Sequence, residues 1–588
     1  MTEKEVKAIE CRFVTHIPAK DSDSPDIHLI KELIHYTDGT TAPNIRFVKD
    51  FKRPFWITKK SLRNHQDKKE WEDLDRLDQY MSTQSDLRYN IARALGKGWS
   101  KETMRALSSS PYLYGSDITS TALIKHSYQV KYPNVVTGYT VCVYDIETDV
   151  VYGTNDIIIG TAILGNKIFT AVTQTFLQGI NDPVRLIKEK YHKYLGEYIE
   201  LLNLQFEIVM VDNPAEIVKE VFKTVHAWSP DFVVAWNIDF DFPKSIQALE
   251  NAGYKPEDIF SDPKVPAKYR RCEYKQGKKK KVTASGKVTP ITPSSQWHTL
   301  YCTAGFYVLD AMCVYKRIRT PPAQEEPSYS LDAILKKELD IGKLKFTEAD
   351  AYSGLRWHEF MQTKYKAEYV VYNIFDCLAV LELDRKTKDL SHTMPSFAGV
   401  TDFDRYTSNP RKIHDALHFY TLDEGKVISA SGSSLKKMTD NGNPNEEEGD
   451  PDTSVSDDDD DEEDENAIGE KLKTLGLTGW IMTLPAHLTV DDGLTVIEED
   501  PSLKTNIRGY VYDSDCRSAY PSATITCNVS KETTKRELSK VEGVDGQVFR
   551  MQNMNLVSGP VNAIEYCTMM MNFPKLDDLL AGFKKTQL

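Results

Sequence analysis

Two carboxylates, Asp145 and Glu147, stand directly after an apolar stretch of the chain. That stretch, residues 139–144 (Tyr-Thr-Val-Cys-Val-Tyr), has the composition of a buried β-strand. Because alternate residues of a strand point to the same face, we expect both side chains on one face at the carboxyl edge of a sheet. The pair is a candidate metal site. Its sequence alone is unspecific, because Asp-x-Glu also occurs in the acidic tract described below.

A further carboxylate, Asp241, lies just past a later apolar stretch, residues 231–236. In a purely structural interpretation it would cap a helix. Farther along, Tyr372 and Asp376 are four residues apart in a sequence typical of a helix, so they share one face. Taken alone, Tyr372 could be an ordinary half-buried tyrosine. Carboxylate oxygens are hard ligands that suit Mg²⁺ or Mn²⁺ rather than zinc.

The elements that must position these side chains alternate between strand and helix patterns over residues 139–390. A hairpin is predicted around Gly165-Asn166. Asn213 is a predicted helix N-cap, with Pro214 at the first helical position. The order of strands and helices predicts an α/β fold with a mixed sheet flanked by helices. The predicted strands are 139–144, 156–164, 167–172, 206–211 and 231–236, and a helix is predicted over 184–204.

The net charge of −14 is concentrated in one place. Residues 446–465 hold fourteen acidic residues and no Lys or Arg, and the rest of the chain carries no net charge. An acidic total therefore does not exclude a polyanionic ligand. The surrounding low-complexity tract, about 438–470, has almost no apolar residues and is predicted to be a disordered insertion. A specific acidic docking element is the alternative.

A basic segment spans residues 264–287, with ten Lys or Arg against the single acid Glu273. Its glycines and β-branched residues predict a projecting hairpin rather than a helix. Clustered lysines bind nucleic acid through counterion release, so Lys278, Lys279, Lys280 and Lys281 are candidate nucleic-acid-binding residues. The alternative is a solvated loop without a ligand.

Composition excludes several classes of protein. No apolar run approaches the roughly 20 residues of a membrane span, and the charged start lacks the pattern of a secretory signal. The nine cysteines are scattered without a Cys-x-x-Cys pair. Reduced thiols in a cytosolic compartment are therefore expected. A disulfide scaffold and a zinc finger are not expected.

Near the end, a short β segment leads into the sequence Asp513-Ser-Asp515-Cys516-Arg-Ser-Ala-Tyr520-Pro-Ser. A lone Tyr-Pro-Ser could be a turn. Taken in order, this segment and the three carboxylate segments resemble family-B DNA polymerases, in particular the replicative polymerases of large tailed bacteriophages. The resemblance extends over essentially the whole chain. Ser328-Tyr-Ser-Leu331 followed by Gly342-Lys343, and Thr478-Gly479-Trp480, fit the same pattern.

By this resemblance, residues 139–390 are a ribonuclease-H-like 3′→5′ exonuclease domain. Asp145, Glu147, Asp241 and Asp376 would bind two Mg²⁺ (or Mn²⁺) ions, one generating hydroxide and the other stabilising the leaving oxygen. Tyr372 would orient the attacking water. The second motif is one residue shorter than in phage relatives, so Asp239 is an alternative to Asp241. Phe240-Asp241 followed by Pro243 favours Asp241.

The segment around Asp515 resembles the first palm motif. There Asp515 would bind both metals, Cys516 would offer its carbonyl, and Tyr520 would select against a ribose 2′-OH. Arg517, Ser518 and Ala519 would contact the triphosphate, although Arg517 and Ala519 depart from the usual small polar and large apolar residues. Asp513 is a competing ligand whose spacing fits less well.

The domains implied are an amino-terminal domain (1–138, with 391–437 returning to it), the exonuclease domain, the acidic insertion (438–470) and the first portion of a palm (471–588). Neither Lys-x-x-x-Asn-Ser-x-Tyr-Gly nor Tyr-Gly-Asp-Thr-Asp follows Asp515. We therefore expect one subunit of a split polymerase, or a truncated polymerase. A second polypeptide would carry the fingers, the rest of the palm and the thumb.

The expected partners are primer-template DNA and dNTPs, with a sliding clamp as a further candidate and no membrane. The expected location is the cytoplasm of the infected bacterial host. One alternative is a stand-alone 3′→5′ exonuclease with a palm remnant. The other is a non-catalytic nucleic-acid-binding regulator, which the mixture of basic and aromatic residues at 46–55 would suit.

Overall fold

The computed structural model describes residues 4–19, 24–66, 68–98, 103–133, 135–282, 288–320, 325–430, 534–540 and 549–555. The chain divides into two compact units, Met1–Asp461 and Glu462–Leu588. In the second unit the structure describes one antiparallel pair, β19 (Thr534–Lys540) with β20 (Phe549–Asn555). All of the site residues considered below, except those of the predicted palm, lie in the first unit.

A six-stranded mixed sheet forms the centre of residues 141–310, in the order β11-β10-β9-β8-β12-β17. β9 runs antiparallel to both of its neighbours, and the other three pairings are parallel. The predicted mixed sheet and the hairpin at Gly165-Asn166 are therefore confirmed. The strands are β8 (Val141–Thr148), β9 (Ile157–Leu164), β10 (Lys167–Thr173), β11 (Gln205–Val211), β12 (Phe232–Ala235) and β17 (Tyr307–Asp310).

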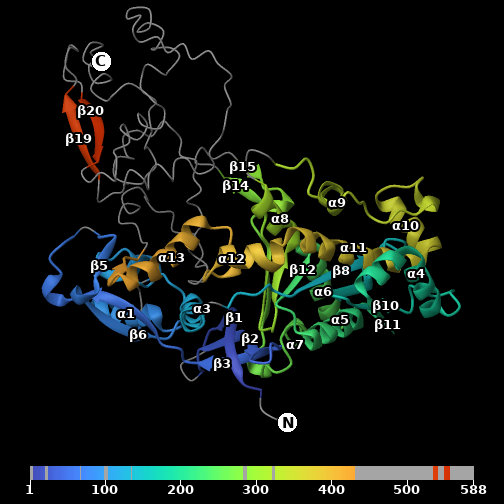
Figure 1. Cartoon of the computed structure of the whole chain (residues 1–588), viewed down its shortest axis with the longest axis horizontal. Helices are drawn as coiled ribbons and strands as arrows, with labels where there is room; N and C mark the ends of the chain where they lie inside the picture. Colours follow the sequence, from blue (N-terminus) through green and yellow to red (C-terminus); the bar gives the residue numbers. More distant parts are fainter. Residues whose placement is uncertain are drawn as a thin grey trace, which may run out of the picture. The chain divides into compact units, whose positions relative to one another are not determined.

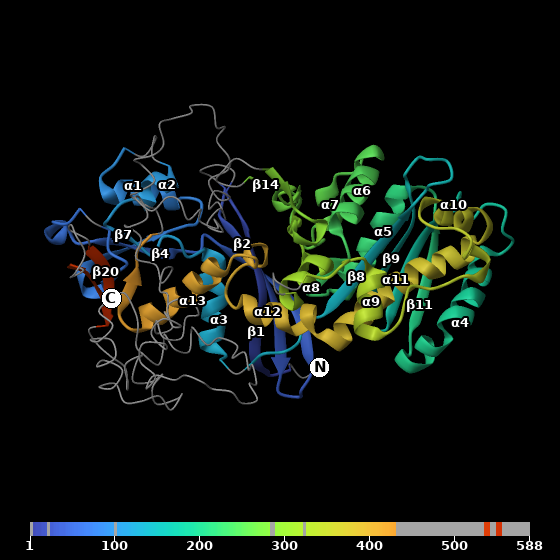
Figure 2. The same ribbon diagram turned by 90° about the horizontal axis from the view of Figure 1, so that it is seen from above.

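Helices cover both faces of this sheet, with α11 on one side of the strands and α5 and α6 on the other (Figures 1 and 2). Alternate residues of β8 enter the two cores: Val141 and Val143 pack with α11, whereas Cys142 and Tyr144 pack with α5 and α6. The face of each β8 residue thus follows from its position in the strand. Helices of the first core include α4 (Pro183–Leu202), α8 (Ala311–Arg319), α9 (Leu331–Leu339) and α11 (Lys366–Thr387); those of the second include α5 (Pro214–Trp228), α6 (Ile238–Asn251) and α7 (Pro256–Phe260).

Local sequence signals account for several of these boundaries. Asn213 caps α5 as predicted, because its Oδ1 accepts the N–H of Glu216 at 3.1 Å and Pro214 occupies the first turn. Of the segment 264–287 that was predicted to be a hairpin, β14 (Lys280–Val282) pairs with β15 (Val288–Pro290), which lies just beyond the segment. The neighbouring strand β13 (Cys272–Lys275) pairs with β16 (Thr299–Cys302) instead.

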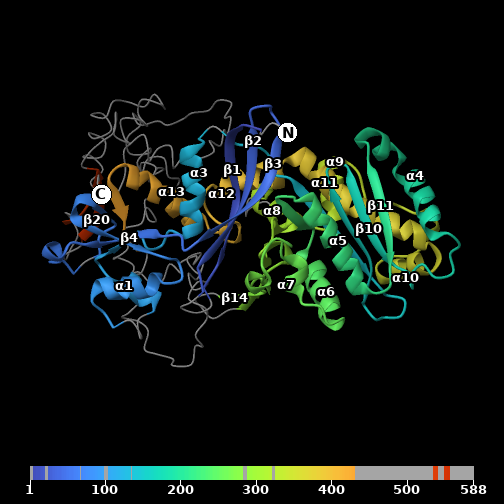
Figure 3. The same ribbon diagram turned by 90° about the horizontal axis from the view of Figure 1, so that it is seen from below.

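The amino-terminal part contains separate small sheets. β1 (Val6–Ile17), β2 (Ile27–Tyr36) and β3 (Thr41–Lys49) form an antiparallel sheet, with α3 (Ser120–Lys131) beside it (Figure 3). The order of a second sheet is β6-β4-β7, and β5 pairs with β18. The remaining elements are β4 (Arg53–Thr58), β5 (Trp71–Asp73), β6 (Leu77–Ser82), β7 (Leu113–Tyr114), β18 (Lys426–Ile428), α1 (Leu87–Leu95), α2 (Met104–Ser108), α10 (Leu355–Lys364), α12 (Met394–Ala398) and α13 (Asn409–Asp423). Across the described ranges, no helix has both the length and the apolar character needed to span a bilayer.

Candidate metal centre

Asp145 and Glu147 lie inside β8, not past its end as the sequence suggested. The strand begins at Val141 and continues to Thr148, because pairing with β9 extends through both carboxylate positions. On the opposite side β12 is shorter, and its register with β8 ends at Val143. The two carboxylates nevertheless share one face, which is the face of β8 that α11 covers.

Helix α11 presents four polar residues to this face, at Tyr369, Tyr372, Asn373 and Asp376. Their spacing of three, four and seven residues from Tyr369 places them on one side of the helix. The Asn373 side-chain amide donates to Asp145 Oδ2 at 2.6 Å, and the Tyr369 hydroxyl donates to Glu147 Oε2 at 2.5 Å. The helix therefore holds both strand carboxylates in position while contributing a carboxylate of its own.

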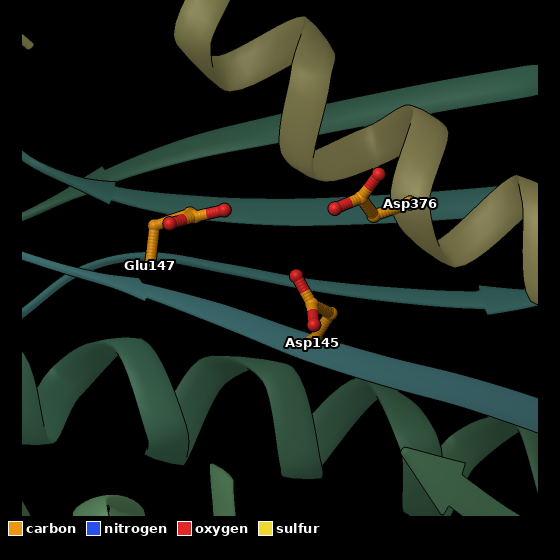
Figure 4. Close-up of side chains that lie close together, drawn as sticks. All are labelled: Asp145, Glu147 and Asp376. Carbon is orange, nitrogen blue, oxygen red and sulfur yellow. The ribbon is translucent and has the colours of Figure 1, made fainter. Parts of the chain in front are cut away.

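The carboxylates of Asp145, Glu147 and Asp376 converge between strand and helix (Figure 4). One oxygen from each lies within 4.8 Å of the others. The Lys343 ammonium lies 2.5 Å from Asp376 Oδ2 and donates to the Tyr372 hydroxyl at 2.8 Å. Asp376 Oδ1 is buried and has no hydrogen-bond partner within the described part of the chain. An unpaired buried carboxylate oxygen beside two further carboxylates fits a divalent cation with oxygen ligands.

Crowding and burial disfavour ionisation of these carboxyl groups. Burial, followed by the charges of Asp241, Glu147 and Asp376, raises the pKa of Asp145 well above its usual range. Burial, with a contribution from Asp376, raises the pKa of Glu147 to about 7 despite the hydrogen bond from Tyr369. Burial also raises the pKa of Asp376, against the opposing effect of Lys343. Positive charge from metal ions would relieve this repulsion.

Asp239 and Asp241, which the sequence left as alternative ligands, lie in different surroundings. Asp241 is buried in the first turn of α6, and its Oδ1 accepts the backbone N–H of Ile146 at 3.2 Å. Its pKa is raised to about 8, chiefly by burial and further by the charge of Glu147. Asp239 is partly exposed and is bonded to Tyr274 instead. Asp241 therefore lies against β8 between the two strand carboxylates, although it is not among the three that converge within 4.8 Å.

Residues from α10 support the centre and were missed in the sequence. The Gln362 side chain donates to the carbonyl of Thr148 at 2.8 Å and to the Tyr369 hydroxyl at 3.2 Å. His358 Nδ1 lies 2.8 Å from the same hydroxyl. Because a phenol has one proton, which Tyr369 donates to Glu147, its oxygen accepts from both. No local pattern marks His358 or Gln362, whereas the spacing of Tyr369 and Asn373 on α11 could have been noticed.

Of the other predicted site residues, Asp515, Cys516, Arg517, Ser518, Ala519 and Tyr520 lie outside the described residues. The acidic tract lies outside them too. Lys278, Lys279 and Lys280 are exposed around the start of β14, and Lys281 lies within that strand.

No protein-family model matches the chain. A stretch of 228 residues, 38% of the chain, is 28% identical to the DNA-directed DNA polymerase of Escherichia phage RB69. The chain is thus related in sequence to a phage DNA polymerase. The matching stretch spans 22% of that polymerase.

Proposed function

We propose that the centre formed by β8 and α11 is the 3′→5′ exonuclease site of a DNA polymerase. The convergence of Asp145, Glu147 and Asp376, with the buried Asp376 oxygen lacking a hydrogen-bond partner in the described structure, carries the proposal. Sequence similarity to a phage DNA polymerase supports DNA as the substrate. In this proposal residues 139–390 are a ribonuclease-H-like domain, and proofreading during phage DNA replication is its role.

The three converging carboxylates would hold two Mg²⁺ or Mn²⁺ ions, with Asp241 as the fourth ligand. When bound, such ions lower the pKa of water and stabilise the leaving oxygen of a phosphodiester. Lys343 remains charged, because Asp376 and Tyr372 raise its pKa although burial alone would lower it. The Lys343 ammonium orients the Tyr372 hydroxyl, and that hydroxyl would in turn position the attacking water. Asn373 and Tyr369 hold Asp145 and Glu147 in place.

The polymerase site is the second part of the proposal. Asp515 would bind both metals of nucleotidyl transfer, with Cys516 contributing its carbonyl. Arg517, Ser518 and Ala519 would contact the triphosphate, and Tyr520 would exclude ribonucleotides. We propose an amino-terminal domain at 1–138 with 391–437, an acidic insertion at 438–470 and the first portion of a palm at 471–588. Further polypeptide, on this or a second chain, would supply the fingers, the rest of the palm and the thumb.

The test is digestion of single-stranded DNA labelled at either end. The chain should shorten DNA from the 3′ end with Mg²⁺ or Mn²⁺ and fail in chelator. Asp145→Asn combined with Glu147→Gln should lower the rate by several orders of magnitude, because both changes remove metal ligands. Glu189→Gln, an exposed change on α4, is the matched control. Digestion that persists in the double variant would show that another site is responsible.

A further inference from the structure

A separate set of contacts, centred on Asp239, joins the basic segment to the first turn of α6. Asp239 Oδ1 accepts hydrogen bonds from the Tyr274 hydroxyl at 2.7 Å and from the Gln276 side-chain amide at 2.8 Å. Its Oδ2 lies 3.7 Å from the Lys279 ammonium. Two hydrogen-bond donors and one ammonium group from one short segment therefore converge on a single carboxylate that the proposed metal centre does not use.

Backbone contacts at Gly277 hold the same segment in place at a second point. Its backbone N–H donates to His298 Nδ1 at 3.1 Å, and a Cβ at this position would lie 1.4 Å from the carbonyl oxygen of Gln296. Because His298 Nδ1 accepts this bond, it cannot also donate to Asp239, which lies 3.5 Å away. The imidazole instead stacks with Tyr274, with ring centroids 6.2 Å apart and planes within 7°. Close backbone packing thus reinforces the contacts to Asp239.

The contacts of Asp239 and Gly277 fix the position of a group of exposed cations. We call residues 275–282 the lysine arm; its Lys275, Lys278, Lys279 and Lys280 side chains are exposed. In the turn of α6 that anchors the arm, Asp241 accepts the N–H of Ile146, between the two carboxylates of β8. The anchor of the lysine arm and the metal centre therefore share one helical turn.

We propose that Asp239 is a positioning residue that anchors the lysine arm to α6, so that a DNA strand bound by the arm meets the metal centre in one register. This inference rests on the proposed exonuclease function. Charge alone predicts the opposite effect of removing Asp239, because a carboxylate repels DNA phosphates and its loss should tighten binding. An anchor predicts weaker binding, because an arm that is no longer preorganised loses more freedom when DNA orders it.

The experiment measures binding of a fluorescent single-stranded DNA in chelator, where no digestion occurs. Asp239→Ala should raise Kd roughly three- to tenfold. Asp239→Asn should stay near the parent value, because its amide oxygen still accepts from Tyr274 and Gln276. Glu250→Ala removes the same charge at the exposed far end of α6 and is the control. Tighter binding by Asp239→Ala would overturn the inference.

Limited trypsin digestion reports on the anchor without any nucleic acid. Cleavage within the lysine arm should be severalfold faster in Asp239→Ala and in Gly277→Ala than in the parent chain. Unchanged cleavage in both variants would overturn the inference. Faster cleavage with weaker DNA binding, in a chain that digests no DNA, would support the anchor and refute the proposed exonuclease.

Steady-state digestion distinguishes an anchor from a metal ligand. With Mg²⁺, Asp239→Ala should raise KM for DNA while kcat stays within about twofold of the parent, because the anchor acts on substrate binding. A fall of kcat by orders of magnitude at saturating DNA would make Asp239 part of the metal centre and overturn its assignment as a positioning residue.

Discussion

The metal-free protein should lose stability as the pH rises from 6 to 8, because the buried carboxyl groups of the centre must then ionise. Glu147 is the clearest contributor, with its pKa raised from 4.5 to about 7 by burial and by Asp376. A carboxyl group whose pKa is higher in the folded than in the unfolded state favours folding most below the unfolded value. Its contribution is lost as the pH rises through the folded pKa, here near 7.

The size of the effect follows from that shift. The difference between about 7 and 4.5 is about 2.5 units, and each unit corresponds to about 1.4 kcal/mol. Ionised Glu147 therefore costs about 3 kcal/mol of unfolding free energy at high pH, of which about 1 kcal/mol is lost between pH 6 and 8. The melting temperature should fall by a few degrees over this interval.

The assay is thermal unfolding in chelator at pH 6, 7 and 8, followed by circular dichroism. Glu147→Gln cannot ionise, so its melting temperature should fall less steeply with pH than that of the parent. Glu189→Gln, on the exposed surface of α4, should follow the parent. Mg²⁺ should raise the melting temperature of the parent more at pH 8 than at pH 6, because it binds the ionised carboxylates of the folded state.

Two results would refute this reasoning. A metal-free parent whose melting temperature does not change between pH 6 and 8 would show that the carboxyl groups ionise without cost. An identical pH dependence in Glu147→Gln would locate the titrating groups elsewhere in the chain.

Replacing Lys278–Lys281 by Ala should weaken DNA binding and reduce the slope of log K against log salt by a few units, measured by titration at several salt concentrations; an unchanged slope would exclude phosphate contacts. His358→Asn keeps a donor near the Nδ1 position, so its rate of DNA digestion should stay within about threefold of the parent. The digestion rate of His358→Gln should fall about tenfold, which is the net value of a hydrogen bond to a buried group. Equal digestion rates in the two variants would refute the supporting role assigned to His358. On the proposed palm assignment, in which Asp515 is the metal ligand, the 588-residue chain alone should not extend a primer in a gel assay, because two-metal phosphoryl transfer needs further carboxylates. In a complex that synthesises DNA, Asp515→Asn should abolish extension and spare digestion, and full synthesis would contradict the palm assignment.

Much of the central sheet could be predicted because its signals are local. Apolar runs, the Gly165-Asn166 turn and the Asn213 cap each depend on a few adjacent residues, and each is present in the structure. The length of β8 could not be predicted in this way. Asp and Glu are poor strand formers, and only pairing with β9 continues the strand through Asp145 and Glu147.

The site was harder to predict where it depends on packing between distant segments. Asp145, Glu147 and Asp376 could be proposed from spacing and resemblance. Lys343 reaches Tyr372 and Asp376 across 29 and 33 residues of sequence, and no local pattern predicts that contact. His358 and Gln362 likewise depend on how α10 packs against α11. The choice between Asp239 and Asp241 as the ligand was open in sequence because both follow the same strand. In the structure the two acids have different hydrogen-bond partners, Ile146 for Asp241 and Tyr274 for Asp239.

The early end of β12 has a consequence for how mutations in this region should be interpreted. Among the residues that the structure describes, no strand pairs with β8 beyond Val143 on the β12 side. There the side chain of Asp241 accepts the N–H of Ile146, which a longer β12 could have bonded. The Asp241 carboxylate therefore makes the hydrogen bond that a carbonyl of a neighbouring strand would otherwise make, and it is also a candidate metal ligand. Asp241→Ala would leave the buried N–H of Ile146 unpaired and destabilise the fold by about 1–3 kcal/mol. A loss of activity in that variant could therefore come either from the weakened fold or from the missing ligand. Asp241→Asn keeps an acceptor for the amide and removes the charge, which makes it the informative substitution.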